Sequence, residues 1–211
     1  MAKLAKKQKI DYFELRRQGF HALTGISILL FLIFNVLNKW VLAAILVLGY
    51  AIYLVNKKLK VPIIWWFVKH FERKENLKET PARGSFFYVL GCFLALVLFP
   101  KDVAYVAIIV LALGDSISTF IGKSYGKTRA PWSNVKLLEG TVAGIALSFL
   151  GFLVLYFFLP GFSVTIFEGL AACIIAMIVE ALEIKVEDRK LDDNVVIPLV
   201  AGAVILILRS L

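Results

Sequence analysis

Long apolar runs separated by short charged blocks are the feature that most limits how this chain of 211 residues can fold. Hydrophobic residues make up 60% of the sequence and charged residues only 18%, and the mean hydropathy is +0.84. A soluble globular domain contains about 45–50% apolar residues. Roughly 20 consecutive apolar residues are needed to cross the bilayer core as a helix. The pattern therefore predicts an all-α integral membrane protein, and it excludes a water-soluble core and a disordered chain.

The apolar runs predict a bundle of about seven transmembrane helices. They cover residues 19–37, 40–55, 84–99, 103–121, 138–159, 164–184 and 195–208. The run 61–68 is too short to span and is flanked by charge, so we expect it at the interface or re-entrant, with Trp65 and Trp66 at headgroup level. We interpret 1–211 as a single membrane-embedded catalytic domain, which includes a basic arm over 1–18 and a cytoplasmic or interfacial segment over 56–83.

The basic residues predict the orientation of this bundle. In the seven-span arrangement only Lys39, Lys101 and Arg209, of the 24 Lys and Arg, fall on the side opposite the N-terminus. The positive-inside rule then makes the N-terminus cytoplasmic. The net charge of +9 faces anionic lipids and solutes. Nucleic-acid binding is not expected, because the charges flank helices and no recognition module is present. No organelle address is visible, so either a cell membrane or one of endoplasmic-reticulum type fits.

A carboxylate lies within one of the apolar runs. Asp115 falls in the predicted helix 103–121 and is followed by Ser116, Ser118 and Thr119. An ionisable side chain inside a membrane segment is energetically expensive and by default indicates a functional site. The alternative is a structural hydrogen bond to a neighbouring helix. We favour a site because the residue is a carboxylate, and we expect it one or two turns from the cytoplasmic end.

A basic loop that contains glycines follows this helix. Lys123, Lys127 and Lys136 lie at the same predicted membrane face as the buried carboxylate, where ammonium groups can bind phosphate. Gly122 and Gly126 can let backbone N–H groups approach a phosphate. The loop is not a P-loop, because the first glycine of that motif is absent and a membrane helix precedes it. The alternative for the lysines is that they only mark the cytoplasmic side.

Further carboxylates fall at the predicted cytoplasmic helix ends. Glu139 opens a helix, where it can be a cap, a metal ligand or an orienting partner for Lys136. Glu180 and Glu183 are three residues apart and share one helix face. Glu168, at the opposite end, is interpreted as an interfacial carboxylate near a helix N-terminus.

The run Asp192-Asp193-Asn194 supplies oxygen ligands at the start of the last helix. Its structural interpretation is a helix N-cap. Clustered oxygen donors near cytoplasmic lysines are typical of Mg²⁺ bound with a nucleoside triphosphate, because Mg²⁺ usually takes one or two carboxylates together with phosphates and water.

Two other patterns concern helix faces. Glu14, Arg17 and His21 share one face and can line a polar pocket, although a lone membrane histidine is more often structural. Gly140 and Gly144 have the spacing of a small-xxx-small motif, which favours close packing within or between chains and so allows an oligomer.

Several of these segments resemble the dolichol kinase and phytol kinase family, the CTP-dependent polyprenol kinases. They are Glu14-Leu-Arg-Arg-Gln-Gly-Phe-His21, Gly114-Asp115 with Ile121-Gly-Lys-Ser-Tyr-Gly-Lys127, Lys136-Leu-Leu-Glu-Gly-Thr141, and Asp192-Asp-Asn-Val-Val-Ile-Pro198. The segment from Arg73 to Gly84 also resembles the family. The resemblance spans most of the chain in order, and it implies a fold shared with phosphatidate cytidylyltransferases.

The resemblance implies transfer of a phosphoryl group from CTP to the hydroxyl of a membrane lipid alcohol, a dolichol-like or polyprenol-like isoprenoid, at the cytoplasmic face. Asp115, together with Glu139, is predicted to bind Mg²⁺. Asp192 or Asp193 is predicted to bind a second Mg²⁺ or to accept the proton of the alcohol. The roles predicted for substrates are phosphate binding by Lys123, Lys127 and Lys136, metal or nucleotide contact by Asn194, and a pocket lined by Arg17 and His21.

Three alternatives remain open at this point. A cytidylyltransferase of the phosphatidate type would form a CDP-lipid, although its glycine- and aspartate-rich C-terminal signature is absent. A kinase of diacylglycerol or phytol would use the same chemistry on another alcohol. A small transporter would use the carboxylates for ion coupling, but we find no internal repeat, and the acidic residues gather at one face.

Overall fold

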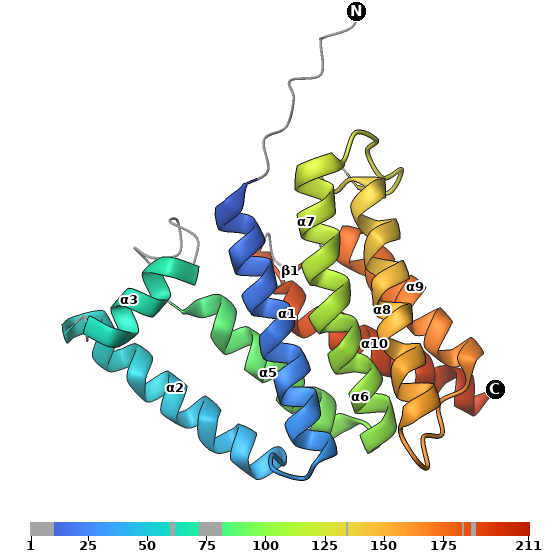
Figure 1. Ribbon diagram of the computed structural model, residues 1–211, viewed down its shortest axis with the longest axis horizontal. Helices are drawn as coiled ribbons and strands as arrows, with labels where there is room; N and C mark the ends of the chain where they lie inside the picture. Colours follow the sequence, from blue (N-terminus) through green and yellow to red (C-terminus); the bar gives the residue numbers. More distant parts are fainter. Residues whose placement is uncertain (1–10, 60–61, 72–81, 134, 183, 187–188) are drawn as a thin grey trace, which may run out of the picture.

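A computed structural model describes residues 11–59, 62–71, 82–133, 135–182, 184–186 and 189–211, and it confirms a helical protein (Figure 1). The helical elements are α1 (Tyr12–Ile33), α2 (Lys39–Leu59), α3 (Pro62–Phe71), α5 (Arg83–Leu98), α6 (Lys101–Ile109), the π-helical segment η1 (Val110–Asp115), α7 (Ser116–Tyr125), α8 (Leu138–Phe158), α9 (Ile166–Leu182) and α10 (Asp193–Ser210). Two strands, β1 (Lys185–Val186) and β2 (Arg189–Lys190), form a small antiparallel pair after α9 that the hydropathy pattern did not predict.

The centre of the bundle is one continuous helix built from α6, η1 and α7. It runs from Lys101 to Tyr125, and the residues from Val103 to Leu111 are all buried. A helix that is apolar on every side is suited to such a central position, and α1, α8 and α10 pack around it. The predicted helix 103–121 therefore ends too early. Asp115 lies well inside the helix, further from its end than the one or two turns predicted.

The first helix also begins earlier than predicted. Asp11 caps it by accepting hydrogen bonds from the backbone N–H groups of Phe13 (3.0 Å) and Glu14 (3.3 Å), which satisfies donors that a helix N-terminus leaves free. Arg17 and His21 are consequently carried on a rigid helix, with His21 more than two turns from its start. Of the predicted arm 1–18 and segment 56–83, residues 1–10, 60–61 and 72–81 lie outside the described residues.

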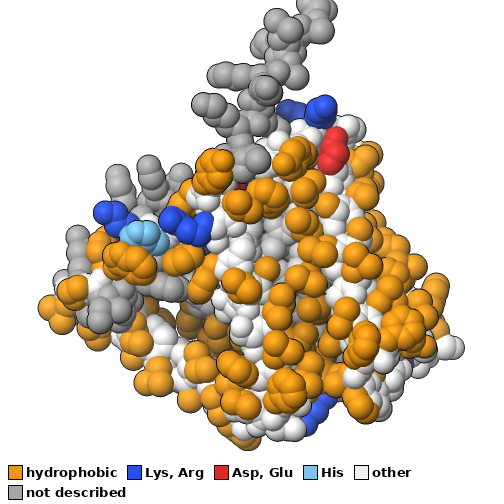
Figure 2. Space-filling view, viewed as in Figure 1, with side chains coloured by type: hydrophobic (Ala, Val, Ile, Leu, Met, Phe, Trp, Pro, Cys, Tyr) orange, Lys and Arg blue, Asp and Glu red, His pale blue; other side chains and the backbone are white. Residues whose placement is uncertain are grey.

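Three helices in the described ranges are long and apolar enough to cross a membrane. They are Lys101–Tyr125, Leu138–Phe158 and Asp193–Ser210. In Figure 2 hydrophobic side chains cover most of the visible middle of the molecule, whereas charged ones gather toward its ends, as expected for a surface in contact with lipid. These features support an integral membrane protein. The count of seven spans and the cytoplasmic N-terminus remain predictions, and α3 has ten residues, too few to span.

The end of the bundle away from the predicted site is joined by a polar network. Arg209 of α10 contacts Asp102 of α6 (3.1 Å) and Glu168 of α9 (3.3 Å). The other carboxylate oxygen of Glu168 accepts from the backbone N–H of Thr165 at 2.7 Å. Glu168 thus has the structural role at a helix N-terminus that its position predicted, and Arg209 connects three helices.

Helices α7 and α8 approach closely at the predicted glycine motif. A Cβ atom at Gly140 would lie 2.4 Å from the carbonyl oxygen of Ser118, and one at Gly144 would lie 3.0 Å from that of Gly114. The packing interpretation of these glycines is therefore confirmed within the chain, because side chains at either position would separate two backbones.

We predict that Gly140→Ala lowers stability by about 1–3 kcal/mol, because the added methyl group overpacks a backbone contact that cannot shift easily. The measurement is thermal unfolding in detergent micelles. The matched control is Gly49→Ala in α2, where an added Cβ meets nothing within 4 Å and the better helix propensity of alanine should leave stability unchanged or raised. Equal melting temperatures for wild type and Gly140→Ala would contradict the proposed tight contact.

Candidate active site

One carboxylate of the candidate site lies near the start of α1 and contacts three polar side chains. Glu14 is buried, and it binds Arg17 at 2.5 Å, Gln18 at 3.0 Å and Lys123 of α7 at 2.9 Å. Arg17 and Gln18 lie one turn along the same helix, so they reach Glu14 at helical spacing. The contact with Lys123 joins α1 to the end of α7, which brings a predicted phosphate ligand beside the predicted pocket residue Arg17.

A second polar pair lies deeper between the same helices. The Nε2 atom of His21 is 3.4 Å from Oδ2 of Asp115, and both side chains are largely buried. Asp115 is the last residue of η1. A π-helical turn changes the helical phase, so it reorients the side chains that follow, and such turns are frequent at functional sites. The structure thus brings together two residues that the sequence predicted separately.

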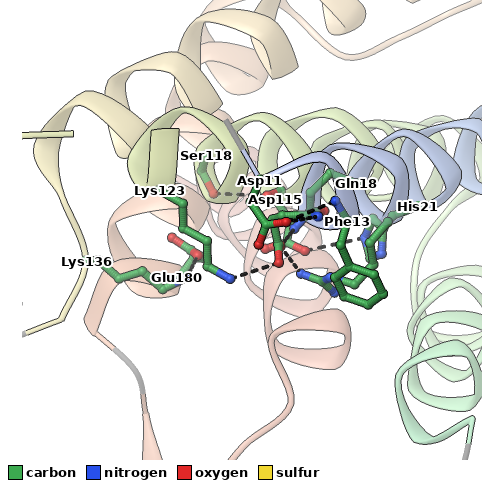
Figure 3. A network of polar contacts seen from close by, with 11 residues as sticks. Asp11, Phe13, Gln18, His21, Asp115, Ser118, Lys123, Lys136 and Glu180 are labelled. Atoms are coloured by element: carbon green, nitrogen blue, oxygen red, sulfur yellow. Dashed lines mark hydrogen bonds and ion pairs between the residues drawn. The ribbon is translucent and has the colours of Figure 1, made fainter. Parts of the chain in front are cut away.

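The third pair connects the loop before α8 with α9. The ammonium group of Lys136 contacts the carboxylate of Glu180, whose side chain is almost completely buried. Burial lowers the pKa of Lys136, but the nearby carboxylates of Glu180, Asp115 and Asp193 outweigh burial and raise its pKa above the usual value. Lys136 therefore carries a positive charge among three carboxylates. In Figure 3 Lys136 and Glu180 lie on one side of Asp115 and His21 lies on the other.

The start of α10 supplies the remaining polar groups. Asp192 caps this helix and accepts from the backbone N–H (3.2 Å) and the side-chain amide (2.8 Å) of Asn194, as its N-cap interpretation predicted. Burial raises the pKa of Asp192, and its carboxylate lies 3.9 Å from the guanidinium of Arg83. Asp193 is close enough to Lys136 to influence its charge. Asp193 therefore acts on the same lysine as Asp115, whereas Asp192 is held by Asn194 and lies near Arg83.

Other predicted residues are placed at the edge of this cluster or away from it. Glu139 accepts from the backbone N–H of Thr128 at 3.0 Å, which fastens the loop before α8. Gly122 packs against Gly140, and the N–H of Gly126 donates to the carbonyl of Gly122 at 3.1 Å. These contacts are structural. Lys127 is exposed, and Glu183 lies outside the described residues.

The carboxylates give a partial fit to Mg²⁺. No group of three or more His, Cys, Asp or Glu side chains in the described part of the chain is arranged to hold a metal ion. Asp115 and Asp193 nevertheless both act on Lys136, so two hard oxygen donors lie near one ammonium group. Mg²⁺ usually takes one or two carboxylates and completes its coordination with phosphates and water, so Asp115 and Asp193 would supply the protein's share of such a site.

A cavity of about 190 Å³ opens beside the cluster, between α1, α3, α5 and the start of α10. Its aromatic walls include Phe20, Phe71 and Tyr88, and its polar side chains include His21 and Asn194. His21 lines the cavity and also contacts Asp115. An apolar space therefore borders directly on the charged groups, an arrangement suited to a substrate with an apolar body and one polar end.

Sequence reasoning left several of these residues out of the predicted site. Glu14 was predicted only to share a pocket-lining helix face with Arg17 and His21, and Glu180 only to share a face with Glu183. Each is in fact the buried carboxylate that holds a predicted lysine. Gln18 and Tyr88 carry no local signal, since a glutamine and a tyrosine within helices are common. The isolated charges of Glu14 and Glu180 were a usable signal, because buried charges require partners.

Comparison of the sequence with known proteins finds similarity to lipid kinases. An uncharacterised protein of Rickettsia prowazekii is 27% identical over 195 residues, which cover 89% of this chain and 90% of that protein. Phytol kinase 1, chloroplastic, of Arabidopsis thaliana is 24% identical over 135 residues, or 60% of this chain and 43% of the kinase. CTP-dependent diacylglycerol kinase 1 of Eremothecium gossypii is 32% identical over 81 residues, or 38% of this chain and 26% of the kinase. Part of the chain is therefore similar to proteins named as lipid kinases.

This relationship confirms the resemblance to CTP-dependent lipid kinases that the sequence segments predicted. It supports a phosphotransferase with an alcohol acceptor, and the name of the diacylglycerol kinase supports CTP as the phosphate donor. The matched segments cover less than half of the two named kinases. No family model matches the chain, and no solved structure matches it.

Proposed function

We propose that this lipid kinase relative transfers the γ-phosphoryl group of CTP to the hydroxyl of a membrane lipid alcohol, a polyprenol-like or dolichol-like isoprenoid, at the cytoplasmic face. The observation that carries the proposal is the position of the charged cluster. Lys123, Lys136 and Arg17 lie near buried carboxylates, and the cavity beside them has aromatic walls. Such a site accommodates a polyanion on one side and an apolar alcohol on the other.

The reaction needs charge neutralisation and positioning more than covalent catalysis. The alcohol oxygen forms a bond to the γ-phosphorus while the bond from that phosphorus to the β–γ bridging oxygen breaks. CDP leaves with the bridging oxygen and its electron pair. The alcohol proton passes to a carboxylate, and Asp192 or Asp193 is the proposed acceptor.

The basic side chains are proposed to hold the triphosphate. Lys123 lies in the last turn of α7 and Lys136 lies just before α8, so they can contact different phosphates of one nucleotide. Lys127 in the loop between them is a further, exposed contact. Asp115 and Asp193 would hold Mg²⁺, which would neutralise charge on the phosphates. Glu139 was predicted to join them, but its bond to Thr128 favours a loop-fastening role.

The proposal is tested with purified protein, Mg²⁺ and CTP labelled at either the γ- or the α-phosphate. The acceptor panel contains a polyprenol, dolichol, phytol, diacylglycerol and phosphatidic acid. We expect the γ-label, and not the α-label, to enter a lipid alcohol, with the polyprenol as the preferred acceptor. Entry of the α-label into lipid would identify a cytidylyltransferase and overturn the kinase proposal. Labelling of phytol or diacylglycerol alone would retain the kinase and overturn the polyprenol assignment.

A further inference from the structure

Four buried polar atoms on residues that line the cavity make no hydrogen bond to the described residues: Nε of Arg17, Nε2 of His21, the hydroxyl of Tyr88 and Oδ1 of Asn194. Two of them belong to side chains that form ion pairs, Arg17 with Glu14 and His21 with Asp115, which leaves the Tyr88 hydroxyl and Asn194 Oδ1 without a charged partner. Buried polar groups in folded proteins are almost always hydrogen-bonded, so unsatisfied groups require an explanation. The Tyr88 hydroxyl and Asn194 Oδ1 beside one cavity indicate a small polar group that a ligand supplies.

The hydrogen-bonding character of these atoms identifies the class of group. The amide nitrogen of Asn194 donates to Asp192, and because an ionised carboxylate only accepts, the free Oδ1 of Asn194 is assigned as an acceptor. It needs a donor. An ionised phosphate offers no donor, whereas an alcohol hydroxyl donates one hydrogen bond and also accepts from a group such as the Tyr88 hydroxyl.

Two glycines build this constellation. A Cβ atom at Gly25 would lie 1.9 Å from the Tyr88 hydroxyl, so only glycine lets that hydroxyl reach α1. A Cβ atom at Gly91 would lie 2.0 Å from the backbone oxygen of Asn194, so glycine also lets the first turn of α10 press against α5. These contacts fix Tyr88 against α1 and the first turn of α10 against α5, and all three helices contribute residues to the cavity lining.

The cavity also has the size for one end of a lipid. An apolar cavity of about 150 Å³ in another protein binds benzene, so about 190 Å³ admits a hydroxyl and the first few carbons of a chain. The rest of a long chain must remain outside. Apolar side chains such as Leu23 on α1 are exposed and can contact it together with the surrounding lipid.

We propose that this cavity is the acceptor site, in which Asn194 and Tyr88 bind the hydroxyl of the lipid alcohol. The assignment rests on the proposed kinase function and adds to it where the acceptor binds. It gives Asn194 a contact to the acceptor in place of the predicted contact to metal or nucleotide. His21, which lines the cavity and contacts Asp115, lies between the acceptor and the phosphate-binding groups.

The test is steady-state kinetics of Tyr88→Phe with phytol and with a polyprenol as acceptors. We expect KM for the alcohol to rise roughly three- to tenfold, the value of one neutral hydrogen bond, with KM for CTP unchanged. The variant should fold, since it removes only an unpaired hydroxyl. The matched control is Tyr105→Phe, which removes a buried hydroxyl bonded to the Leu32 carbonyl at 3.3 Å and should leave both KM values unchanged.

A second variant blocks the cavity from its exposed side. Ser85 is exposed and lines the cavity, so the Ser85→Trp variant should fold. It should weaken the crosslinking of a photoreactive isoprenoid alcohol to α1 and α5 by tenfold or more. Its CTP binding should be retained. Wild-type crosslinking in Ser85→Trp, or an unchanged alcohol KM in Tyr88→Phe, would overturn the acceptor site while leaving the kinase proposal intact. Failure of wild-type protein to phosphorylate any alcohol would overturn the kinase proposal itself. The crosslinking experiment would then show by itself whether the cavity binds an isoprenoid alcohol.

Discussion

Asp115→Asn is expected to reduce CTP-dependent lipid phosphorylation by roughly 100- to 1,000-fold or more, because it removes a preorganised charge from the reacting centre. The substitution keeps the size of the side chain and removes its charge. It therefore weakens the proposed Mg²⁺ site and the attraction to Lys136, and it changes the group that faces His21 at 3.4 Å. The measurement is incorporation of γ-label from CTP into lipid by variant and wild type at matched concentration.

The matched control for this variant is Asp102→Asn at the opposite end of the bundle. Asp102 is also a partly buried carboxylate in an ion pair, with Arg209 at 3.1 Å, so the two substitutions make the same chemical change. We expect Asp102→Asn to retain at least half of the wild-type rate and to lower only the melting temperature. Wild-type turnover by folded Asp115→Asn protein would remove Asp115 from the active site.

Lys136→Met is expected to affect stability and activity together. Glu180 is 1% exposed and would lose its positive partner, and a buried charge left without compensation lowers stability by about 3–5 kcal/mol. Activity should fall about 100-fold, because an ammonium group proposed to contact the phosphates is also lost. Thermal unfolding and γ-label incorporation measure the two effects separately.

The double variant Lys136→Met with Glu180→Gln separates the two roles of Lys136. Neutralising Glu180 removes the uncompensated charge, so the melting temperature should return toward that of wild type. Activity should remain low, because no cation is restored. Recovery of both properties in the double variant would mean that Lys136 only balances Glu180 and does not bind phosphate.

Several features of the site were predictable because they depend on local chemistry. Asp115 was predicted as a site residue because it is a carboxylate inside an apolar run, and burying a charge in a membrane is unfavourable without a function or a partner. Helical spacing placed Arg17 and His21 on one face, because residues three and four apart are neighbours on a helix. The run of oxygen donors at Asp192 was interpreted either as a set of Mg²⁺ ligands or as a helix N-cap, and the structure confirms the cap.

Other features could not be predicted because they depend on pairs far apart in the chain. No local pattern joins Lys136 to Glu180, or Glu14 to Lys123, which are 109 residues apart. The π-helical segment before Asp115 arises within an apolar run whose composition suits an ordinary α-helix equally well. The cavity has no sequence signal of its own, because its walls come from four helices and its polar atoms are defined by the partners that they lack.

By itself the sequence determined that this protein is helical, that it belongs in a membrane and which residue types gather near its charged segments. These properties follow from hydropathy, helix capping and residue spacing. Each of these acts within one helix and can be recognised in a short stretch of consecutive residues. The tertiary structure alone decided which carboxylate holds which lysine, that His21 meets Asp115, and that an apolar cavity borders the charges. Each of these requires two or more helices to be packed against one another, and packing depends on side-chain shape across the whole bundle.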